Sequence, residues 1–280
     1  MNLNRVKIVA DSSSDVTGLS DIAFESAPLK IITADKEYVD DQNVDVLGMV
    51  TDLRSYKGKT STSCPNADDW LRAFGDAEYV FCVTITATLS GSYNAAVMAK
   101  DTYEEMYPGR RVFVLNSLTT GPEMALMVDK IRELVLLGKD FDEVCNVVTK
   151  YAEKTGLLFM LESMQNLANN GRVSPLVAKM AGLLGIRVVG KASDRGDLEP
   201  LNKCRGEIKA LETILEHLKN SGLKKGRVKI AHCFNNKAAH ALKELIESRL
   251  EEVKVSVCSC RALCSFYAEK GGLLVGFEKE

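Results

Sequence analysis

Two hydroxyl-rich segments in the first third of the chain each precede a predicted helix. One contains Thr62 and Ser63 within the run KTSTSCPN, and the other contains Ser90 and Gly91 within the run TITATLSGS. The start of a helix exposes backbone N–H groups and carries positive partial charge, which favours an anion. One hydroxyl is enough to cap a helix, whereas each segment supplies several. We therefore predict that the two segments together form a site for an anionic group.

Two other polar clusters are predicted to support this site. Asp11 and Ser12 belong to the run DSSSD, which directly follows an apolar segment, and such side chains commonly bond the amides of a turn. Phosphatases that use a strand-end aspartate need a second acid two residues later, whereas Asp15 follows four residues later. Arg172 lies in the predicted tight turn NNGRVSP. An arginine in such a place usually bonds carbonyls or a carboxylate across an interface, so a ligand role is the minority interpretation.

No catalytic set emerges from the sequence. The three histidines have no evident nucleophile partner, and neither a G-x-G-x-x-G nor an H-E-x-x-H motif occurs. We therefore expect no enzymatic activity. Two alternatives stay open. The first is a hydrolase or phosphotransferase that uses Asp11 or Ser90. The second is a regulatory interaction module that binds a partner through charged helices around Leu211–Asn220 and Lys243–Glu252.

The chain contains eight cysteines, and Cys258, Cys260 and Cys264 form the only cluster where a metal could be argued. Their spacing matches neither paired C-x-x-C knuckles nor a ferredoxin run, although His232 and Cys233 could complete a site. Free cysteines packed in the core are the favoured interpretation, and no metal is predicted.

The composition is that of a globular protein. Hydrophobic residues make up 46% and charged residues 26% of 280 positions, and the formal net charge is −2. This charge argues against a nucleic-acid-binding surface. No stretch of about 18 apolar residues predicts a membrane span, and the N-terminus has no signal-peptide core. We therefore expect a cytoplasmic protein.

Residues 1–155 are predicted to form a three-layer α/β/α domain. Short apolar runs that predict strands alternate with segments of helical periodicity, which indicates a parallel sheet covered on both faces. Ligands bind such sheets beyond the carboxyl ends of the strands, where the polar clusters lie. The predicted strands are Val6–Ala10, Tyr79–Ile85 and Arg111–Leu115, and the predicted helices are Ala67–Phe74, Ser92–Tyr107 and Pro122–Leu137.

Residues 156–280 are predicted to form a second, two-layer α/β domain. A short polar turn at Ser193–Asp197 joins two adjacent predicted strands, which favours a hairpin and hence a mixed sheet. The predicted strands are Gly156–Leu161, Ile186–Lys191 and Glu199–Cys204, and the first helices are around Ser163–Asn169 and Pro175–Leu184.

Taken in order, the polar motifs resemble those of the DegV family of bacterial fatty-acid-binding proteins. The resemblance covers essentially the whole chain, with Ser92 in place of a threonine and Asn170 in place of a glycine. The matching segments are Asp11–Asp15, Thr62-Ser63-Cys64-Pro65, Leu89-Ser90-Gly91-Ser92-Tyr93 and Leu161–Ser174.

The resemblance implies a long-chain fatty acid, such as palmitate or oleate, buried in a tunnel between two domains, with no other cofactor. It implies that Thr62 and Ser90 hold the carboxylate, with Ser63 and Gly91 adjacent. Family members that act as carriers present the acid to a separate fatty acid kinase, which makes an acyl phosphate for phospholipid synthesis.

Tyr267 departs from the family pattern. It stands where family members often have a histidine, ahead of the glycine-rich stretch Glu269-Lys270-Gly271-Gly272. We expect Tyr267 to support the carboxylate site. If the histidine takes part in the kinase reaction, its absence would affect that partnership more than fatty-acid binding.

Overall fold

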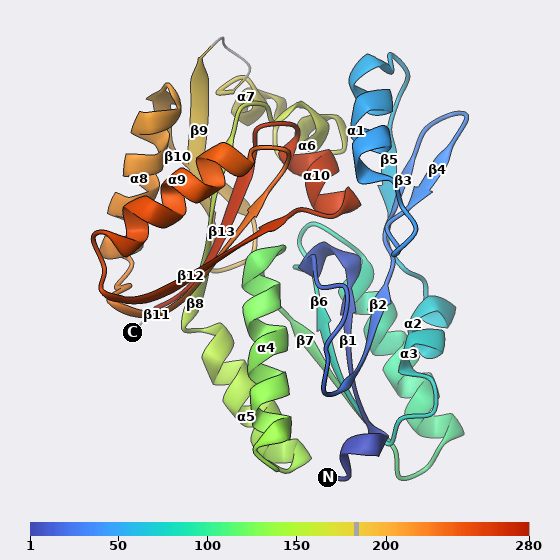
Figure 1. The fold of residues 1–280 in the computed structure, drawn as a ribbon. Helices are drawn as coiled ribbons and strands as arrows, with labels where there is room; N and C mark the ends of the chain where they lie inside the picture. Colours follow the sequence, from blue (N-terminus) through green and yellow to red (C-terminus); the bar gives the residue numbers. More distant parts are fainter. Residues whose placement is uncertain (182–184, 280) are drawn as a thin grey trace.

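The structure is a computed structural model that describes residues 1–181 and 185–279. A parallel sheet formed by the first part of the chain and a larger mixed sheet formed by the second part lie on either side of helix α4 (Pro122–Leu136) (Figure 1). This arrangement confirms the predicted α/β fold class.

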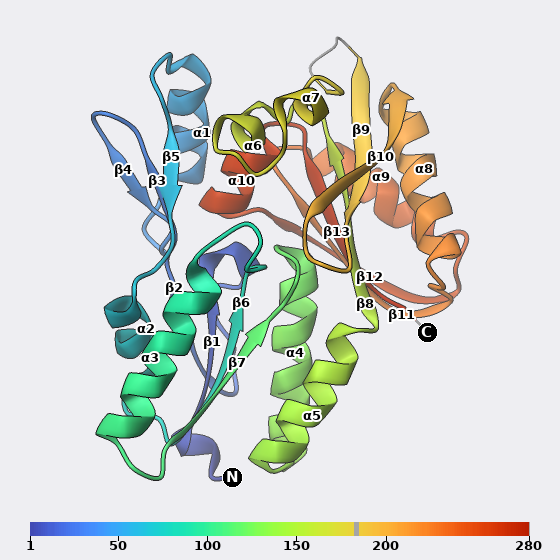
Figure 2. The same ribbon diagram turned by 180° about the vertical axis from the view of Figure 1, so that it is seen from behind.

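The first sheet has four parallel strands in the order β2-β1-β6-β7. Alternate residues face opposite layers, as the pleat of a strand requires. Ile8 and Phe81 pack with α4 and α5, whereas Val9 and Cys82 pack with α2 and α3. The sheet therefore has helices on both faces (Figure 2). Its elements are β1 (Val6–Asp11), β2 (Ala23–Ala27), β6 (Tyr79–Thr84), β7 (Arg111–Asn116), α2 (Ala67–Phe74), α3 (Ser92–Met106) and α5 (Phe141–Ala152).

A small antiparallel sheet and helix α1 (Val46–Ser55) extend beyond the first sheet, and α1 packs against α10 (Ala262–Ala268). The sheet has the order β4-β3-β5 and consists of β3 (Lys30–Ile32), β4 (Glu37–Val39) and β5 (Ser61–Ser63). The sequence did not predict these strands, because three residues are too few to show a period of two.

The expected helix start at Thr62 and Ser63 was wrong. Both residues lie in β5, which pairs with β3. The N-cap of α2 is Asn66, whose side chain accepts the Asp69 N–H while Asp69 accepts the Asn66 N–H. This reciprocal capping box already satisfies the helix end, so the hydroxyls of β5 are not needed as caps.

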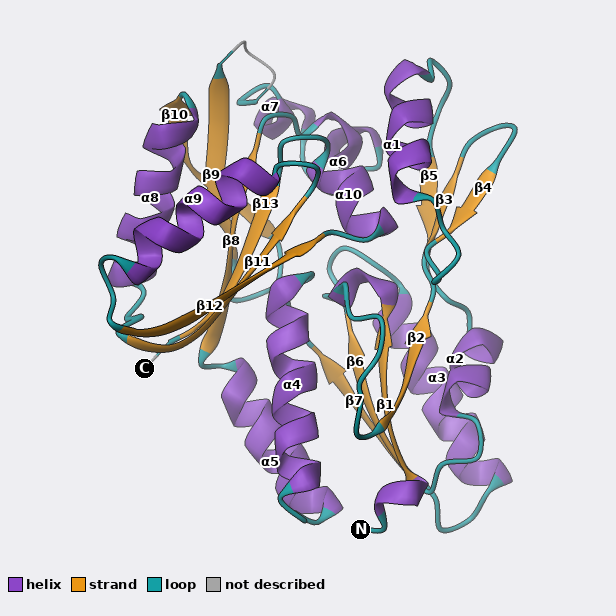
Figure 3. Cartoon of the chain, in the orientation of Figure 1, coloured by secondary structure: helices purple, strands orange, loops and turns teal. Residues whose placement is uncertain are grey.

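The second sheet has six strands in the order β10-β9-β8-β13-β11-β12. Strands β11 and β12 are parallel and the other neighbours are antiparallel, including the predicted β9–β10 hairpin. Helices α8 and α9 cover one face (Figure 3). The elements are β8 (Thr155–Leu161), β9 (Ile186–Ala192), β10 (Leu198–Arg205), β11 (Lys225–His232), β12 (Glu252–Ser259), β13 (Leu273–Glu278), α6 (Gln165–Asn169), α7 (Pro175–Ala178), α8 (Glu207–Asn220) and α9 (Asn236–Glu247).

Two expectations for this half need comment. The predicted helix around Lys243–Glu252 is wrong at its end, because α9 stops at Glu247 and Glu252 begins β12. Helix α7 stops at Ala178, and positions 182–184 of the predicted helix lie outside the described residues.

Helix α4 packs on both large sheets. Met127 and Ile131 belong to the core of the first sheet, and the start of the helix lies against β13. A Cβ atom on Gly276 would lie 2.4 Å from the Glu123 backbone nitrogen, so this approach requires a glycine. The division after residue 155 remains a prediction. Among the described residues, no helix has the length and apolar character needed to cross a bilayer.

Candidate functional site

A cavity of about 260 Å³ lies between the first sheet, the small sheet and the second sheet. Its wall is largely apolar, with a group of hydroxyl-bearing side chains. The lining residues are Leu29, Thr62, Ser63, Cys64, Ile85, Leu89, Ser90, Gly91, Thr120, Leu157, Phe159, Leu161, Leu167, Arg172, Leu198, Leu263, Cys264, Tyr267, Ala268 and Leu274.

The four residues predicted to bind the anionic group all line this cavity. Thr62 and Ser63 come from β5, whereas Ser90 and Gly91 come from the loop between β6 and α3. The two segments touch, because a Cβ atom on Gly91 would lie 3.2 Å from the sulfur of Cys64. Gly91 is the N-cap of α3 and has no side chain to cap the helix. The positive end of α3 therefore lies beside the hydroxyls.

Tyr267 joins this group from α10. Its hydroxyl oxygen lies 2.7 Å from the hydroxyl oxygen of Thr62. Burial raises the pKa of Tyr267, while the Thr62 hydrogen bond and the positive charge of Arg172 act in the opposite direction. The phenol therefore keeps its proton at neutral pH and can donate a hydrogen bond to an anion.

Arg172 also lines the cavity, but its guanidinium bonds backbone carbonyls. Its Nε donates to the Leu89 oxygen at 3.1 Å, and a terminal nitrogen donates to the Asn170 oxygen. The first bond ties the turn before α7 to the loop that carries Ser90, as expected for an interface arginine.

Asp11 and Ser12 lie behind the cavity wall rather than in it. The buried Asp11 carboxylate accepts the Ile85 N–H at 2.8 Å and the Ser92 hydroxyl at 2.7 Å. The Ser12 hydroxyl accepts the Leu29 N–H at 3.0 Å. Ile85 and Leu29 line the cavity, so these bonds hold its wall in place. Burial raises the pKa of Asp11.

Strand β8 provides one apolar wall of the cavity. Leu157, Phe159 and Leu161 alternate along it and all face the cavity, whereas Leu158 and Met160 pack under the helices on the other face. At about 3.3 Å per residue, the wall from Leu157 to Leu161 is roughly 13 Å long. The site thus combines an apolar cavity with a local cluster of hydrogen-bond donors.

A family model described as an uncharacterised protein of the DegV family matches residues 5–280. This chain belongs to the DegV family. A DegV domain-containing protein of Streptococcus pneumoniae is 42% identical over 276 residues, which cover 97% of this chain and 98% of the relative.

Two solved DegV structures are closely similar to this chain. One is a DegV family protein from Eubacterium eligens loaded with heptadecanoic acid, with a TM-score of 0.97 and 39% identity over 98% of this chain and all of that chain (100%). The other is the Fatty Acid Kinase (Fak) B3 protein of Streptococcus pneumoniae loaded with linoleic acid. Its TM-score is 0.96, with 41% identity over 98% of this chain and 99% of that one.

Sequence reasoning missed the contribution of α10 to this DegV site beyond Tyr267. Leu263 and Cys264 also line the cavity. Helix α10 is seven residues long and nearly all buried, so it shows no amphipathic period that would mark its orientation.

All eight cysteines are free thiols. Burial raises the pKa of Cys260 and Cys264 well above the usual value for a thiol, which keeps both neutral. Among the described residues, no group of three or more histidine, cysteine or acidic side chains is arranged to hold a metal ion.

Proposed function

We propose that this chain binds one long-chain fatty acid non-covalently in the cavity and presents its carboxylate to a separate fatty acid kinase. The observation that carries the proposal is the apolar cavity with the hydroxyls of Thr62, Ser90 and Tyr267 on its wall. Two relatives at 39% and 41% identity, loaded with heptadecanoic and linoleic acid, support it.

Burial of the acyl chain would drive binding. Burial of an acyl chain of about sixteen carbons contributes more than about 10 kcal/mol of binding free energy before opposing terms are counted, at about 0.8 kcal/mol per methylene group. Loss of translational and rotational freedom offsets about 4–15 kcal/mol of such a gain. The carboxylate must therefore keep good hydrogen bonds inside the protein, since an unpaired buried charge would cancel much of the remainder.

The proposed carboxylate site uses hydroxyl and amide donors. Thr62, Ser90 and Tyr267 each have a hydroxyl that can donate, and Ser63 and Gly91 lie beside them. Because these donors carry no formal charge, they would hold the acid while leaving its oxygens nucleophilic. A kinase that phosphorylates the carboxylate requires this property. The relative called Fatty Acid Kinase (Fak) B3 supports the kinase partnership.

The structure gives less support to the hydrolase alternative. Asp11 is fully enclosed and its oxygens already accept hydrogen bonds, so it cannot approach a substrate in the cavity. Ser90 accepts a bond from the Ser92 N–H at 3.2 Å. Within the described part of the chain, no histidine or carboxylate shares a hydrogen bond with the Ser90 hydroxyl, as a general base would.

Mass spectrometry of a lipid extract from the purified protein, followed by oleate titration of the delipidated protein, tests the proposal. Replacing Thr62 by Val and Ser90 by Ala should each weaken oleate binding. A lost hydrogen bond to a charged group costs about 1.5–3 kcal/mol, which corresponds to roughly a 10- to 150-fold rise in Kd.

Ser61→Ala provides the matched control, because Ser61 is exposed on the same strand and does not line the cavity. Its Kd should equal that of the wild type. An extract without fatty acid, together with no oleate binding by the delipidated protein, would falsify the proposed function.

A further inference from the structure

Helix α10 begins without a cap of its own. Its N-cap residue is Arg261, whose side chain makes no capping hydrogen bond. The helix nevertheless supplies Tyr267 to the proposed carboxylate site, and Leu263 and Cys264 to the cavity wall. The position of its first turn therefore determines the geometry of the site.

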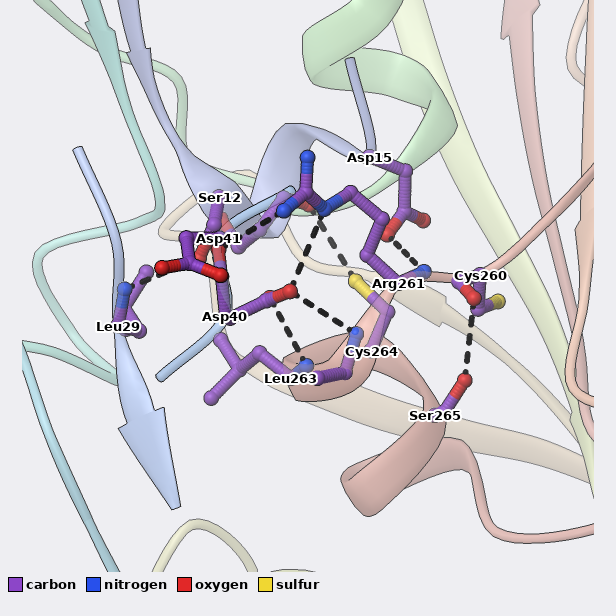
Figure 4. A network of polar contacts seen from close by, with 12 residues as sticks. Ser12, Asp15, Leu29, Asp40, Asp41, Cys260, Arg261, Leu263, Cys264 and Ser265 are labelled. Carbon is purple, nitrogen blue, oxygen red and sulfur yellow. Dashed lines mark hydrogen bonds and ion pairs between the residues drawn. The ribbon is translucent and has the colours of Figure 1, made fainter. Parts of the chain in front are cut away.

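Carboxylates from the first part of the chain satisfy the N–H groups at the start of α10 (Figure 4). Asp40 accepts the Ala262 N–H at 3.1 Å through one oxygen and the Leu263 N–H at 3.0 Å through the other. Asp15 accepts the Arg261 N–H at 2.7 Å. The capping groups of this helix thus come from residues more than 200 positions away in sequence.

Asp40 is fully buried and also neutralises Arg261. The Arg261 Nε lies 3.3 Å from a carboxylate oxygen of Asp40, and a terminal nitrogen donates to the Asp40 backbone oxygen at 3.0 Å. Burial raises the pKa of Asp40, and the Leu263 N–H and the charge of Arg261 counteract this effect. A buried carboxylate with this many donors is held in one place.

We propose that Asp40 is a positioning residue for the carboxylate site, because it fixes the start of α10 and thereby holds the Tyr267 hydroxyl at Thr62. The inference rests on the proposed function. Tyr267 follows Leu263 by four residues, which is about one helical turn or 5.4–6 Å along the axis. A tilt of the helix that begins at its first turn therefore changes the direction in which the phenol points. The 2.7 Å contact with Thr62 tolerates little displacement.

The other end of α10 is fixed independently of Asp40. The Asn166 side chain donates to the Phe266 oxygen at 2.8 Å, and Glu269 accepts the Ser163 hydroxyl at 2.9 Å. Loss of the Asp40 contacts should therefore tilt α10 about this anchored end rather than release it, and such a tilt would turn the Tyr267 hydroxyl away from Thr62.

A double-mutant cycle tests this coupling with oleate as the probe. Asp40→Asn keeps the volume and one acceptor oxygen, and Tyr267→Phe removes only the hydroxyl. Each single variant should raise the oleate Kd roughly 10-fold, the effect of about one hydrogen bond to a charged group. The double variant should bind no more weakly than Tyr267→Phe alone, because both changes remove the same contact. If the rise in Kd of the double variant is the product of the two single rises, the inference is overturned.

Two further variants separate positioning from general damage. Asp140→Asn makes the same exchange at the cap of α5, which lies outside the cavity wall, and should leave the oleate Kd unchanged. If Asp40→Asn does not fold because Arg261 is left unpaired, Asp40→Asn with Arg261→Met removes the buried charge, and the cycle is repeated in that background. If neither wild type nor Asp140→Asn binds oleate, the proposed function itself is contradicted. If wild type and Asp140→Asn bind oleate normally but the binding losses of Asp40→Asn and Tyr267→Phe add up in the double variant, only the role of Asp40 is contradicted.

Discussion

Tyr267 supplies a phenol to the cavity wall, and a phenol differs from a histidine in how it responds to pH. Burial raises the pKa of Tyr267, so its hydroxyl stays protonated throughout the physiological range. A histidine has an ordinary pKa of about 6.5 and changes charge within that range. The contribution of Tyr267 to binding should therefore be independent of pH.

We expect Tyr267→His to make oleate binding depend on pH. Protonation of the imidazole below about pH 6.5 adds a positive charge near the carboxylate, so affinity should rise as pH falls. Titrations with oleate at intervals between pH 6 and 8 measure this effect. Tyr267→Phe, which has no titrating group at this position, should follow the wild-type profile. A wild-type profile as steep as that of Tyr267→His would contradict the assignment.

Asp15 introduces a pH dependence of stability. Its Oδ2 is buried, and burial raises the pKa of Asp15 to about 7 from 3.8. Between these values the folded protein holds a proton that the unfolded chain has released. Stability should therefore fall as pH rises from about 4 to about 7 and then level off.

Asp15→Asn should remove up to about 1.4 kcal/mol per pH unit of this slope. Urea unfolding at pH 5, 6, 7 and 8 measures it. Burial raises the pKa of Glu123 to about 7 as well, so Glu123→Gln should flatten the curve separately. An Asp15→Asn variant with the wild-type slope would show that Asp15 titrates normally.

At this scale the sequence identified only part of the site. The segments of Thr62 and Ser90 could be singled out because they contain more hydroxyls than helix capping requires, and the family resemblance pointed to these two residues within them. Asp40 and Arg261 could not, because their pairing joins positions 221 residues apart and neither lies in a recognisable motif. Buried ion pairs of this kind depend on tertiary packing, which leaves no local pattern.

Among the elements, the β9–β10 hairpin has the most demanding contact with the first part of the chain. Its turn residue Gly196 is buried with φ +86°, and its oxygen accepts the Thr88 hydroxyl at 2.9 Å. A Cβ atom on Gly196 would lie 2.0 Å from the Thr86 hydroxyl oxygen and 3.0 Å from the Leu118 Cα. The neighbouring Leu198 lines the cavity.

Gly196→Ala should therefore displace the hairpin tip and widen the cavity. We expect a loss of more than about 1–3 kcal/mol in unfolding free energy, because a contact with backbone is added to the cost of positive φ. The oleate Kd should rise as well. Gly138→Ala is the matched control, since Gly138 has φ +74° and no neighbour within 4 Å of its would-be Cβ. Gly138→Ala should lower the unfolding free energy only by the cost of positive φ and should leave the oleate Kd unchanged. Equal losses in both variants would show that the Gly196 contact is unimportant.

Element length decided which parts of the fold could be predicted. Strands β1, β6 and β7 and helices α2, α3 and α4 were placed within a few residues, because each shows a clear run or period, whereas β2 and α5 were not predicted. The three-residue strands β3–β5 were missed, and with them the fact that Thr62 lies in a strand. Its side chain faces the cavity because of pairing with Ile31, not because of helix capping.

For the whole molecule, the contacts that α4 and α5 make with the second sheet indicate that the two large sheets unfold together. Arg227 of β11 donates to Glu278 of β13 at 2.9 Å and also bonds Glu133 of α4 and the Tyr151 hydroxyl of α5. Helix α4 therefore bonds the second sheet through this cluster while packing on the first. The cavity lies between the same layers, so a bound acid would add contacts to both.

Thermal unfolding should accordingly show one cooperative transition that shifts upward with oleate. A ligand at 100 times its Kd stabilises the folded state by about 2.7 kcal/mol, which corresponds to roughly 5 °C for a protein of this size. Calorimetry of the delipidated protein with and without oleate measures the shift. The combined Thr62→Val and Ser90→Ala variant should shift far less at the same oleate concentration, because its Kd is higher. Two transitions of which only one moves with oleate would mean that the acid contacts one sheet alone. That outcome would place its chain outside the shared cavity, even though binding itself occurs.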